Sequence, residues 1–249
     1  MQRWFSLFFL LLLSPLPPAE AIEADALMGQ IDRLWRGNTS QATLSMEVRT
    51  RHYTRTMKMD VWSKGQTHSL LIIREPKKDQ GIATLKAGKK IWNYLPKINR
   101  TTRIPASMMA GRWMGSHFTH DDLVKESQYQ EDYESHLTFE GERDGTLLYE
   151  VTSIPKADAA IVWGKVVTEI LQISLMPLKA TYFDEAGASV RTLYFDQLRE
   201  IEGRTLPMRL RVIPKDKPNE STPILYQQIH FDQPLTEQHF SLRSLKQPH

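Results

Sequence analysis

The 249-residue chain contains no cysteine. Without a thiol the protein cannot use a cysteine nucleophile, a cysteine metal site or a disulfide bond, and it cannot carry a lipid on an N-terminal cysteine. A chain of this length can bury enough surface to stay folded without disulfide bonds, even when it is secreted. The missing cysteines therefore exclude thiol chemistry but not export.

Motifs of common enzyme sites are also missing. The chain has no G-x-S-x-G nucleophile elbow, no phosphate-binding glycine loop and no H-E-x-x-H zinc motif. In His117-Phe118-Thr119-His120-Asp121-Asp122, two histidines three positions apart lie beside two carboxylates and could bind zinc if helical. Thr119-x-x-Asp122 is more typical of a helix start, where an acidic residue stabilises the first turn. We expect a helix cap there, no metal, no cofactor and no enzyme.

The chain has little net charge, because 32 basic residues nearly balance 29 acidic ones. Six basic residues nevertheless cluster around Trp92 and Tyr94: Lys86, Lys89, Lys90, Lys97, Arg100 and Arg103. Such a mixture can indicate a nucleic-acid surface. In an exported protein a solvated sheet edge fits better, and an anionic membrane surface is the second interpretation. We expect no nucleic-acid partner.

Only one stretch is hydrophobic enough to interact with a membrane as a helix, at residues 5–13. It follows the short basic start Met1-Gln2-Arg3 and precedes Ala19-Glu20-Ala21, which fits the small-x-small rule for signal-peptide cleavage. The run is well short of the roughly 20 residues that a spanning helix needs. We therefore predict a signal peptide of residues 1–21, cleaved after Ala21, and a soluble mature chain of 249 − 21 = 228 residues.

The spacing of apolar residues changes near Gly37. Over residues 24–36, Leu27, Ile31 and Leu34 recur at helical intervals and predict one amphipathic helix that ends at Gly37-Asn38. Beyond that point apolar and polar residues alternate with a period of two, as in Leu44, Met46 and Val48. The remainder of the chain is therefore predicted to be mostly strands.

Glycine turns separate these strands, and Asp144-Gly145 is the strongest hairpin signal. The predicted strands cover residues 41–50, 54–63, 67–74, 81–87, 90–95, 135–142, 146–154, 163–172, 178–184 and 189–198, with two more near 205–213 and 223–231. The connections are too short for parallel crossovers, and no repeat or linker divides the chain. We predict a mainly β (α+β) fold: one curled antiparallel sheet, with helices from the N-terminus, residues 105–125 and the tail after Thr236 laid on one side.

Several stretches of the sequence are distinctive beyond their periodicity. The most specific runs from Trp92-x-Tyr94-x-Pro96 through Gly115-Ser116-x-Phe118-x-x-Asp121-Asp122-Leu123, inside KKDQGIATLKAGKKIWNYLPKINRTTRIPASMMAGRWMGSHFTHDDLVKES. Others are LWRGNTSQATLSMEV, AAIVWGKVV and QQIHFDQPLTEQHFSLRSL. In these stretches, from about Leu34 to Leu245, the chain resembles the periplasmic outer-membrane lipoprotein-sorting proteins, the LolA-like family.

The resemblance implies a single domain over residues 22–249, an incomplete β-barrel whose concave apolar face is covered by helices and holds acyl chains. It implies a non-catalytic, monomeric periplasmic carrier or chaperone that transfers lipoproteins or other lipids toward the outer membrane. An inner-membrane exporter of the ABC or RND type and an outer-membrane acceptor are the expected partners. The alternative is a sensor or accessory subunit of such an exporter, and an enzyme that uses the hollow is a third interpretation.

The lipid-binding side chains follow from the apolar strands and from the unusual stretch Met-Met-Ala-Gly-Arg-Trp-Met-Gly at residues 108–115. Methionine fills irregular space and suits surfaces that accept varied apolar partners. This stretch is either a plug that swings out of the hollow about Gly111 and Gly115 or a fixed part of the core. We expect acyl chains to contact Met46, Met57, Met59, Trp92, Tyr94, Met108, Met109, Trp113, Met114 and Phe118. Family carriers use an arginine near the cavity mouth, for which Arg49, Arg51 and Arg55 are candidates.

Overall fold

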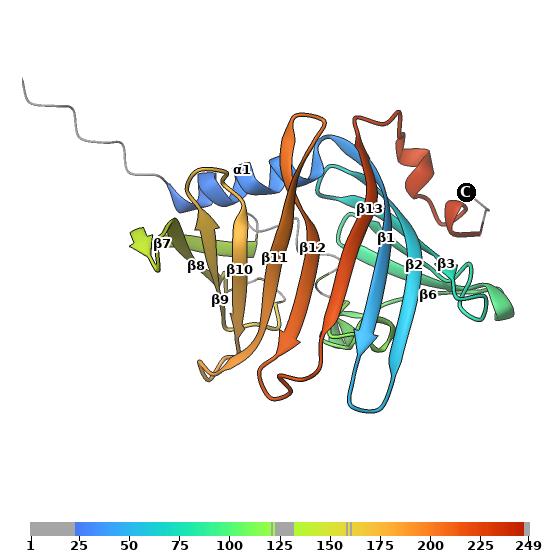
Figure 1. The fold of residues 1–249 in the computed structure, drawn as a ribbon. Helices are drawn as coiled ribbons and strands as arrows, with labels where there is room; N and C mark the ends of the chain where they lie inside the picture. The colour runs from blue at the N-terminus through green and yellow to red at the C-terminus, as the bar shows by residue number, and fades with distance from the viewer. Residues whose placement is uncertain (1–22, 121, 123–131, 158, 160, 247–249) are drawn as a thin grey trace, which may run out of the picture.

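The computed structural model describes residues 23–120, 122, 132–157, 159 and 161–246. Thirteen antiparallel strands form one sheet that curls without closing (Figure 1). This confirms the predicted fold class. The predicted signal peptide lies outside the described residues. Among the residues that are described, no helix combines the length and the hydrophobicity needed to span a membrane.

The strands fall into two groups along the chain. The first group is β1 (Thr39–Arg49), β2 (Thr54–Lys64), β3 (His68–Glu75), β4 (Ala83–Ala87), β5 (Lys90–Leu95) and β6 (Arg100–Arg103). The second is β7 (Tyr133–Arg143), β8 (Thr146–Pro155), β9 (Lys165–Leu171), β10 (Pro177–Phe183), β11 (Ser189–Ile201), β12 (Arg204–Pro214) and β13 (Thr222–Phe231). All twelve predicted strands are present. The prediction missed β6, because the sequence Arg-Thr-Thr-Arg offers no apolar alternation.

Each group is a series of neighbouring antiparallel strands, and the two groups meet where β1 pairs with β13 in the middle of the sheet. The edge strands are β6 and β7. Both ends of the sheet bend away from the viewer in Figure 1, toward the side on which α1 lies. We call that side the concave face and the other the convex face.

The helix α1 (Ala24–Arg36) covers one end of the concave face and confirms the predicted amphipathic helix. Its apolar side buries Leu27, Met28 and Ile31 in a cluster with Val151 of β8 and Ile170 of β9. Gly37 ends the helix with a φ of 61°, a left-handed value that favours glycine. An added Cβ at Gly37 would lie 3.0 Å from the ring of Phe231, so a larger residue would be strained here and would press on that ring.

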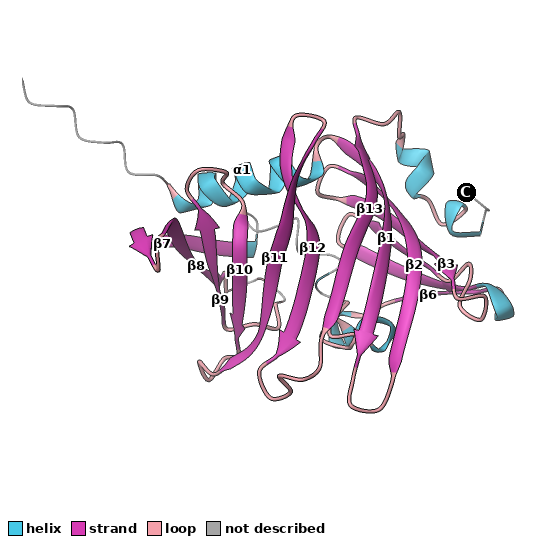
Figure 2. Ribbon diagram, viewed as in Figure 1, coloured by secondary structure: helices cyan, strands magenta, loops and turns pink. Residues whose placement is uncertain are grey.

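The C-terminal tail covers the opposite, convex face, which corrects the prediction that all helices lie on one side. Its two 3-10 turns, η4 (Glu237–Phe240) and η5 (Ser244–Lys246), place Phe240 and Leu245 in a buried cluster with Trp62, Leu70 and neighbouring residues of β3 and β4. Figure 2 shows these turns in cyan, apart from α1. The side chains of β3 are apolar on both faces of the sheet, so other apolar groups must pack against each face.

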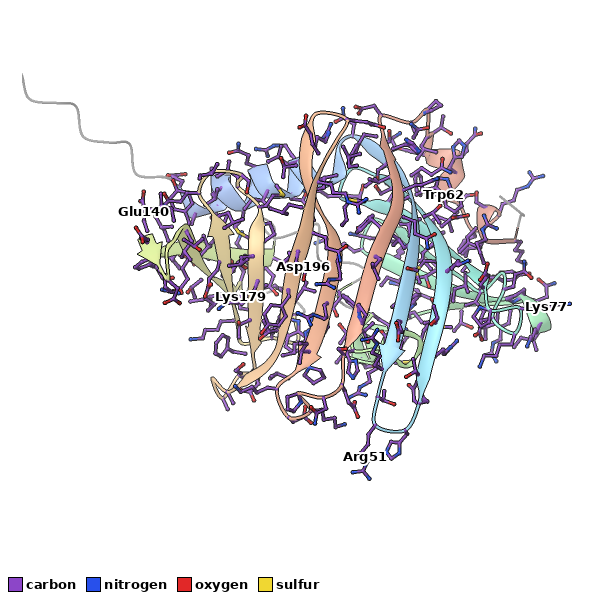
Figure 3. The ribbon with its side chains drawn as sticks, in the orientation of Figure 1. Arg51, Trp62, Lys77, Glu140, Lys179 and Asp196 are labelled. Atoms are coloured by element: carbon purple, nitrogen blue, oxygen red, sulfur yellow. The ribbon has the colours of Figure 1, made fainter. Side chains whose placement is uncertain are left out.

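On β9 to β12, the convex face carries ion pairs in place of apolar side chains packed under the tail. Lys179 pairs with Glu169 (3.0 Å) and Arg209 with Asp196, and Figure 3 shows Lys179 and Asp196 on the side toward the viewer. These pairs are partly exposed and contribute little to stability. This part of the convex face is therefore an ordinary solvated surface.

The tail should stabilise the sheet through Phe240. We predict that Phe240→Ala lowers the free energy of unfolding by about 3–5 kcal/mol, as for other large buried apolar residues, because Phe240 is 3% exposed. The matched control is Leu242→Ala in the same tail, where the side chain is 47% exposed and the expected change is within about 0.5 kcal/mol. Urea denaturation of both variants measures the difference, and equal effects would contradict the packing described for the tail.

Candidate functional site

An apolar cavity of about 150 Å³ lies on the concave face. Its walls come from β1, β2 and β3 on one side and from β12 and β13 on the other, with Trp113 and Phe118 filling space between them. A dry cavity of roughly this size holds a molecule such as benzene. A longer acyl chain therefore fits only if the side chains that occupy the hollow move.

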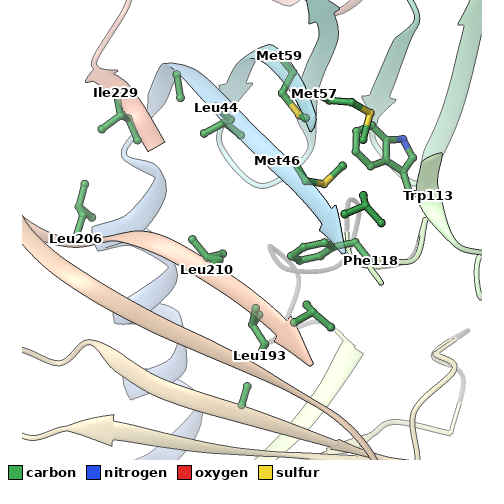
Figure 4. Close-up of a cluster of buried hydrophobic side chains, with 14 of the residues drawn as sticks. Leu44, Met46, Met57, Met59, Trp113, Phe118, Leu193, Leu206, Leu210 and Ile229 are labelled. Atoms are coloured by element: carbon green, nitrogen blue, oxygen red, sulfur yellow. The ribbon is translucent and has the colours of Figure 1, made fainter. Parts of the chain in front are cut away.

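Two methionines, Met46 of β1 and Met59 of β2, line this hollow, and Met57 of β2 is buried in the same cluster. Met46 lies opposite Met57, and Leu44 lies opposite Met59, in the pairing of the two strands. All three methionines are buried. Figure 4 shows them on the same side of the sheet as Trp113, Phe118 and Leu210. The flexible thioether side chains give a lining that can adapt its shape.

The segment of residues 104–120 crosses the hollow, and we call it the inserted segment. In place of the predicted helix it contains two 3-10 turns, η2 (Ala106–Met108) and η3 (Trp113–Gly115). The indole of Trp113 is 2% exposed, and its Nε1 donates to Thr84 Oγ1 over 3.3 Å. The backbone nitrogen of Trp113 also donates to the carbonyl of Phe118 (2.8 Å), so the two aromatic residues stand on one small loop.

Two hydrogen bonds hold this loop to the β1–β2 hairpin. Tyr53 Oη donates to the carbonyl of Gly115 (3.0 Å), and Arg55 donates to the carbonyl of Met114 (3.3 Å). Arg55 also pairs with Asp79 (2.6 Å). Of the three candidate arginines, Arg55 reaches the inserted segment. Arg49 pairs with Glu47, and Arg51 lies at the tip of the hairpin (Figure 3).

A buried ion pair anchors the chain at Asp122, just beyond the inserted segment. Both oxygens of Asp122 accept hydrogen bonds from the guanidinium of Arg191, which also donates to the carbonyl of His117 (3.1 Å). The guanidinium lies 4.3 and 4.2 Å from the ring centroids of Trp163 and Tyr182. Separating a buried pair of this kind leaves an uncompensated charge in the interior and strongly destabilises the folded protein. The pair therefore holds the chain at Asp122 in place.

The hydrogen bonds expected of a helix cap are present between Thr119 and Asp122. Thr119 donates its backbone N–H to Asp122 (2.6 Å), and the backbone N–H of Asp122 donates to the hydroxyl of Thr119 (3.2 Å). Residues 123–131, where such a helix would continue, lie outside the described residues. The sequence pattern thus predicted these hydrogen bonds but missed Arg191, which lies 69 residues away.

His117 is buried in a second polar contact near this anchor. Its Nδ1 lies 2.8 Å from the hydroxyl of Thr222, and its Nε2 lies 3.2 Å from Glu220. Burial lowers the pKa of His117, and the nearby Glu220 opposes that shift. The N–H of Arg51 is the main cause of a lowered pKa at Glu220, followed by the hydrogen bond from His117.

These contacts leave little support for a metal at the histidines. Thr222 and Glu220 occupy the two ring nitrogens of His117, and His120 Nδ1 lies 2.9 Å from the carbonyl of Gly111. Within the described part of the chain, no three histidine, aspartate or glutamate side chains are grouped as a metal site would require. Asp121 lies outside the described residues.

The ten side chains proposed from the sequence fall into three sets. Those in or against the main concave cluster are Met46, Met57, Met59, Trp113, Phe118 and Met114. Met108 is 53% exposed and Met109 is partly buried, both on the inserted segment. Trp92 and Tyr94 point to the convex face and pack against the cluster beneath the tail. Alternation along β5 could not reveal which of its faces is concave.

The predicted basic sheet edge needs one correction. Lys89, Lys90, Lys97, Arg100 and Arg103 are exposed around β5 and β6, as expected. Lys86 is instead buried, at 4% exposure, and lines the cavity. The reason is the period of the strand, since alternate residues of β4 point to opposite faces.

Comparison with known proteins assigns the chain to a family. A family model described as an uncharacterized protein matches residues 65–247, more than half of the chain. The chain belongs to that family. No curated protein matches the sequence.

Several solved structures share the fold of this family member. A structure from Vibrio parahaemolyticus, described as an outer membrane lipoprotein-sorting protein domain, is 23% identical with a TM-score of 0.81 and covers 90% of this chain and 98% of its own. A DUF1329 family protein from Desulfovibrio piger is 21% identical, with a TM-score of 0.81 and coverage of 89% and 97%. A LolA superfamily protein from Nitrosomonas europaea is 20% identical, with a TM-score of 0.78 and coverage of 90% and 100%. The LolA-like fold expected from the sequence is therefore confirmed.

The buried histidine should make stability depend on pH. Because the pKa of His117 is lowered in the folded state, the unfolded chain binds more protons at pH values just below about 6.5. The free energy of unfolding should therefore fall as the pH drops from 7.5 to 5.5, by at most about 1.4 kcal/mol per pH unit for one proton. Urea denaturation across this range measures the slope.

His117→Gln should flatten that slope, because the variant has no proton to bind at this position. His136→Gln is the control, since His136 lies on β7 with a side chain that is 53% exposed. If the His117 variant kept the slope of the wild-type protein, the buried histidine would not be its source.

Proposed function

We propose that the protein is a non-catalytic carrier that binds acyl chains of lipoproteins or other lipids on its concave face. The observation that carries this proposal is the hollow itself, which is lined mostly by apolar side chains and filled by two aromatic residues of the inserted segment. The proposal also draws support from a structural neighbour described as an outer membrane lipoprotein-sorting protein domain. A pocket with an apolar lining and few polar groups suits a hydrocarbon ligand.

The contacts of the inserted segment suggest how the hollow opens. Near Asp122 the segment is held by a buried ion pair, whereas at Met114 and Gly115 it is held by hydrogen bonds from Arg55 and Tyr53. Met114 and Gly115 have left-handed φ values of 50° and 73°. We propose that the turn at Met114 and Gly115 moves while Asp122 stays in place, which carries Trp113 out of the hollow.

A plug of this kind makes release possible. Each buried methylene group is worth about 0.8 kcal/mol, so ten of them give roughly 8 kcal/mol, near micromolar affinity before the cost of ordering the chain. Several complete acyl chains would then bind too tightly to be handed on. Displacing Trp113 and Phe118 lowers the net affinity, because their own apolar contacts are lost when cargo enters.

The same proposal covers the cellular setting expected from the sequence. The chain would be exported to the periplasm, with cleavage after Ala21, and residues 22–249 would form the monomeric carrier domain. It would receive cargo from an inner-membrane exporter and pass it to an outer-membrane acceptor.

Native mass spectrometry tests the function directly. Protein purified from the periplasm under mild conditions should carry bound lipid, which denaturation releases, and an apolar fluorescent dye should compete with that lipid. Adding a chelator should change neither result. A protein that carries no lipid and binds no apolar dye would contradict the proposal.

The plug predicts a different effect at each of two tryptophans. Trp113→Ala should raise the affinity for an apolar dye several-fold, because the indole no longer competes for the hollow, and should lower the melting temperature only modestly. A fixed core tryptophan would instead cost about 3–5 kcal/mol of stability. Trp92→Ala, beneath the tail on the convex face, should destabilise without changing dye affinity. Severe unfolding of the Trp113 variant with unchanged affinity would show that the inserted segment is fixed core.

A further inference from the structure

Two turns lie side by side at one end of the strands β3 to β6. One is the loop of residues 76–81 between β3 and β4, and the other is the 3-10 turn η1 (Pro96–Ile98) between β5 and β6. An added Cβ at Gly81 would lie 3.3 Å from the proline of η1, so the two turns lie against each other. Lys77 of the first turn lies at the opposite end of the molecule from β7 (Figures 1 and 3). We call residues 76–81 and 95–100 the basic tip.

The basic tip presents positive charge to solvent. The acidic side chains beside it are already paired, Asp79 with Arg55 (2.6 Å) and Glu75 with Lys58 (3.1 Å). Four basic side chains of the tip are exposed and form no ion pair with any other described residue: Lys77, Lys78, Lys97 and Arg100. Their charge is therefore available to a partner.

The same tip exposes two aliphatic side chains among these charges. Leu95 is 40% exposed and Ile98 is 63% exposed. They lie three positions apart, the spacing at which side chains share one side of a 3-10 turn. Pro96 and the left-handed Asn99 (φ 45°) shape the turn, and Tyr94 Oη donates to Asn99 Oδ1 over 3.4 Å. The turn is thus braced in a form that leaves Ile98 outside the core.

Protection of the sheet edge explains only part of this arrangement. Basic residues on the edge strand β6 discourage another strand from pairing with it, a role that fits Arg100 and Arg103. That role needs neither Lys77 and Lys78, which lie in the loop between β3 and β4, nor the exposed Ile98. A surface for single-stranded nucleic acid would combine the charges with aromatic side chains that stack on bases, whereas the exposed apolar residues here are aliphatic.

We propose that the basic tip docks on the surface of an anionic membrane. Aliphatic side chains flanked by lysine and arginine suit the boundary between head groups and acyl chains, where the aliphatic groups are buried and the cations meet anionic heads. This inference goes beyond the proposed carrier function, because it concerns the surface that the protein contacts and not the content of its hollow.

The opposite edge of the sheet would favour one orientation on such a surface. Four acidic side chains of β7 and the turn after it are exposed: Glu134, Glu140, Glu142 and Asp144. An anionic membrane repels this edge and attracts the tip, so the molecule meets the membrane with β6 first. The strand β6 runs from the tip to the inserted segment over four residues, about 13 Å. Docking therefore brings that segment close to the membrane.

Cosedimentation with lipid vesicles tests the docking. The wild-type protein should sediment with vesicles of equal parts phosphatidylcholine and phosphatidylglycerol but not with phosphatidylcholine alone. Salt at about 0.5 M should release it, because exposed charges are screened. Lys97→Gln combined with Arg100→Gln should weaken binding about twentyfold or more, from about fivefold for each basic residue near an anionic surface. Ile98→Ser should weaken it several-fold, because the apolar contact is lost.

Two matched controls separate the tip from the rest of the surface. Arg199→Gln combined with Lys215→Gln removes the same charge from exposed positions on β11 and just after β12. Ile173→Ser removes an isoleucine that is 92% exposed, in the turn between β9 and β10. Neither control should change vesicle binding by more than about twofold. A charge control that weakened binding as much as the tip variant would indicate general attraction and overturn the docking site.

The outcomes also separate this inference from the proposed function. The tip variants should bind an apolar dye as the wild-type protein does, because Lys97, Ile98 and Arg100 do not line the hollow. If the wild-type protein binds the dye but does not sediment with anionic vesicles, or if the tip variants sediment as well as it does, the docking site is wrong and the carrier remains. Sedimentation that depends on the tip, in a protein that binds no dye, would support docking and contradict the carrier.

Discussion

A sheet that curls without closing has a concave face that its own side chains cannot fill. The strands bend so that apolar residues of β1 and β2 face those of β12 across a hollow, and water in that hollow would be costly. Other parts of the molecule cover or fill this hollow. The helix α1 covers one end, and the inserted segment places Trp113 and Phe118 in the middle. Under the proposed function, a ligand would take the place of that filling.

Apolar contacts alone would not give the inserted segment a defined position, because they have no direction. The Arg191–Asp122 pair supplies that direction, since two guanidinium nitrogens must meet two carboxylate oxygens. The rings of Trp163 and Tyr182 flank the guanidinium and keep it away from water. The hydrogen bonds of Tyr53 and Arg55 to Gly115 and Met114 involve backbone carbonyls and a more exposed part of the chain. Stability is therefore distributed unevenly along the segment.

Local pattern predicted the sheet well and the site only in part. Period-two alternation identified twelve strands, and the pattern Thr119-x-x-Asp122 predicted the paired hydrogen bonds between these two residues. The contact of His117 with Glu220 spans 103 residues and depends on how β13 is aligned, which no local pattern encodes. Local pattern also could not show which face of a strand lies on the concave side. Because β4 and β5 are flanked by apolar groups on both sides, alternation could not tell that Lys86 points into the hollow and Trp92 away from it.

The pairing of β1 with β13 has a consequence for how the chain is assembled. Ser40 and Phe231 are partners although 231 − 40 = 191 residues separate them. A chain that emerges from its N-terminus can build β1 to β6 early, but one side of β1 keeps unpaired N–H and C=O groups until the end of the chain arrives. An unpaired strand edge beside apolar side chains is a template for aggregation. Contacts this distant in sequence also slow folding. The nascent protein is thus most vulnerable just before its synthesis is complete, which is when a chaperone that shields β1 would matter most.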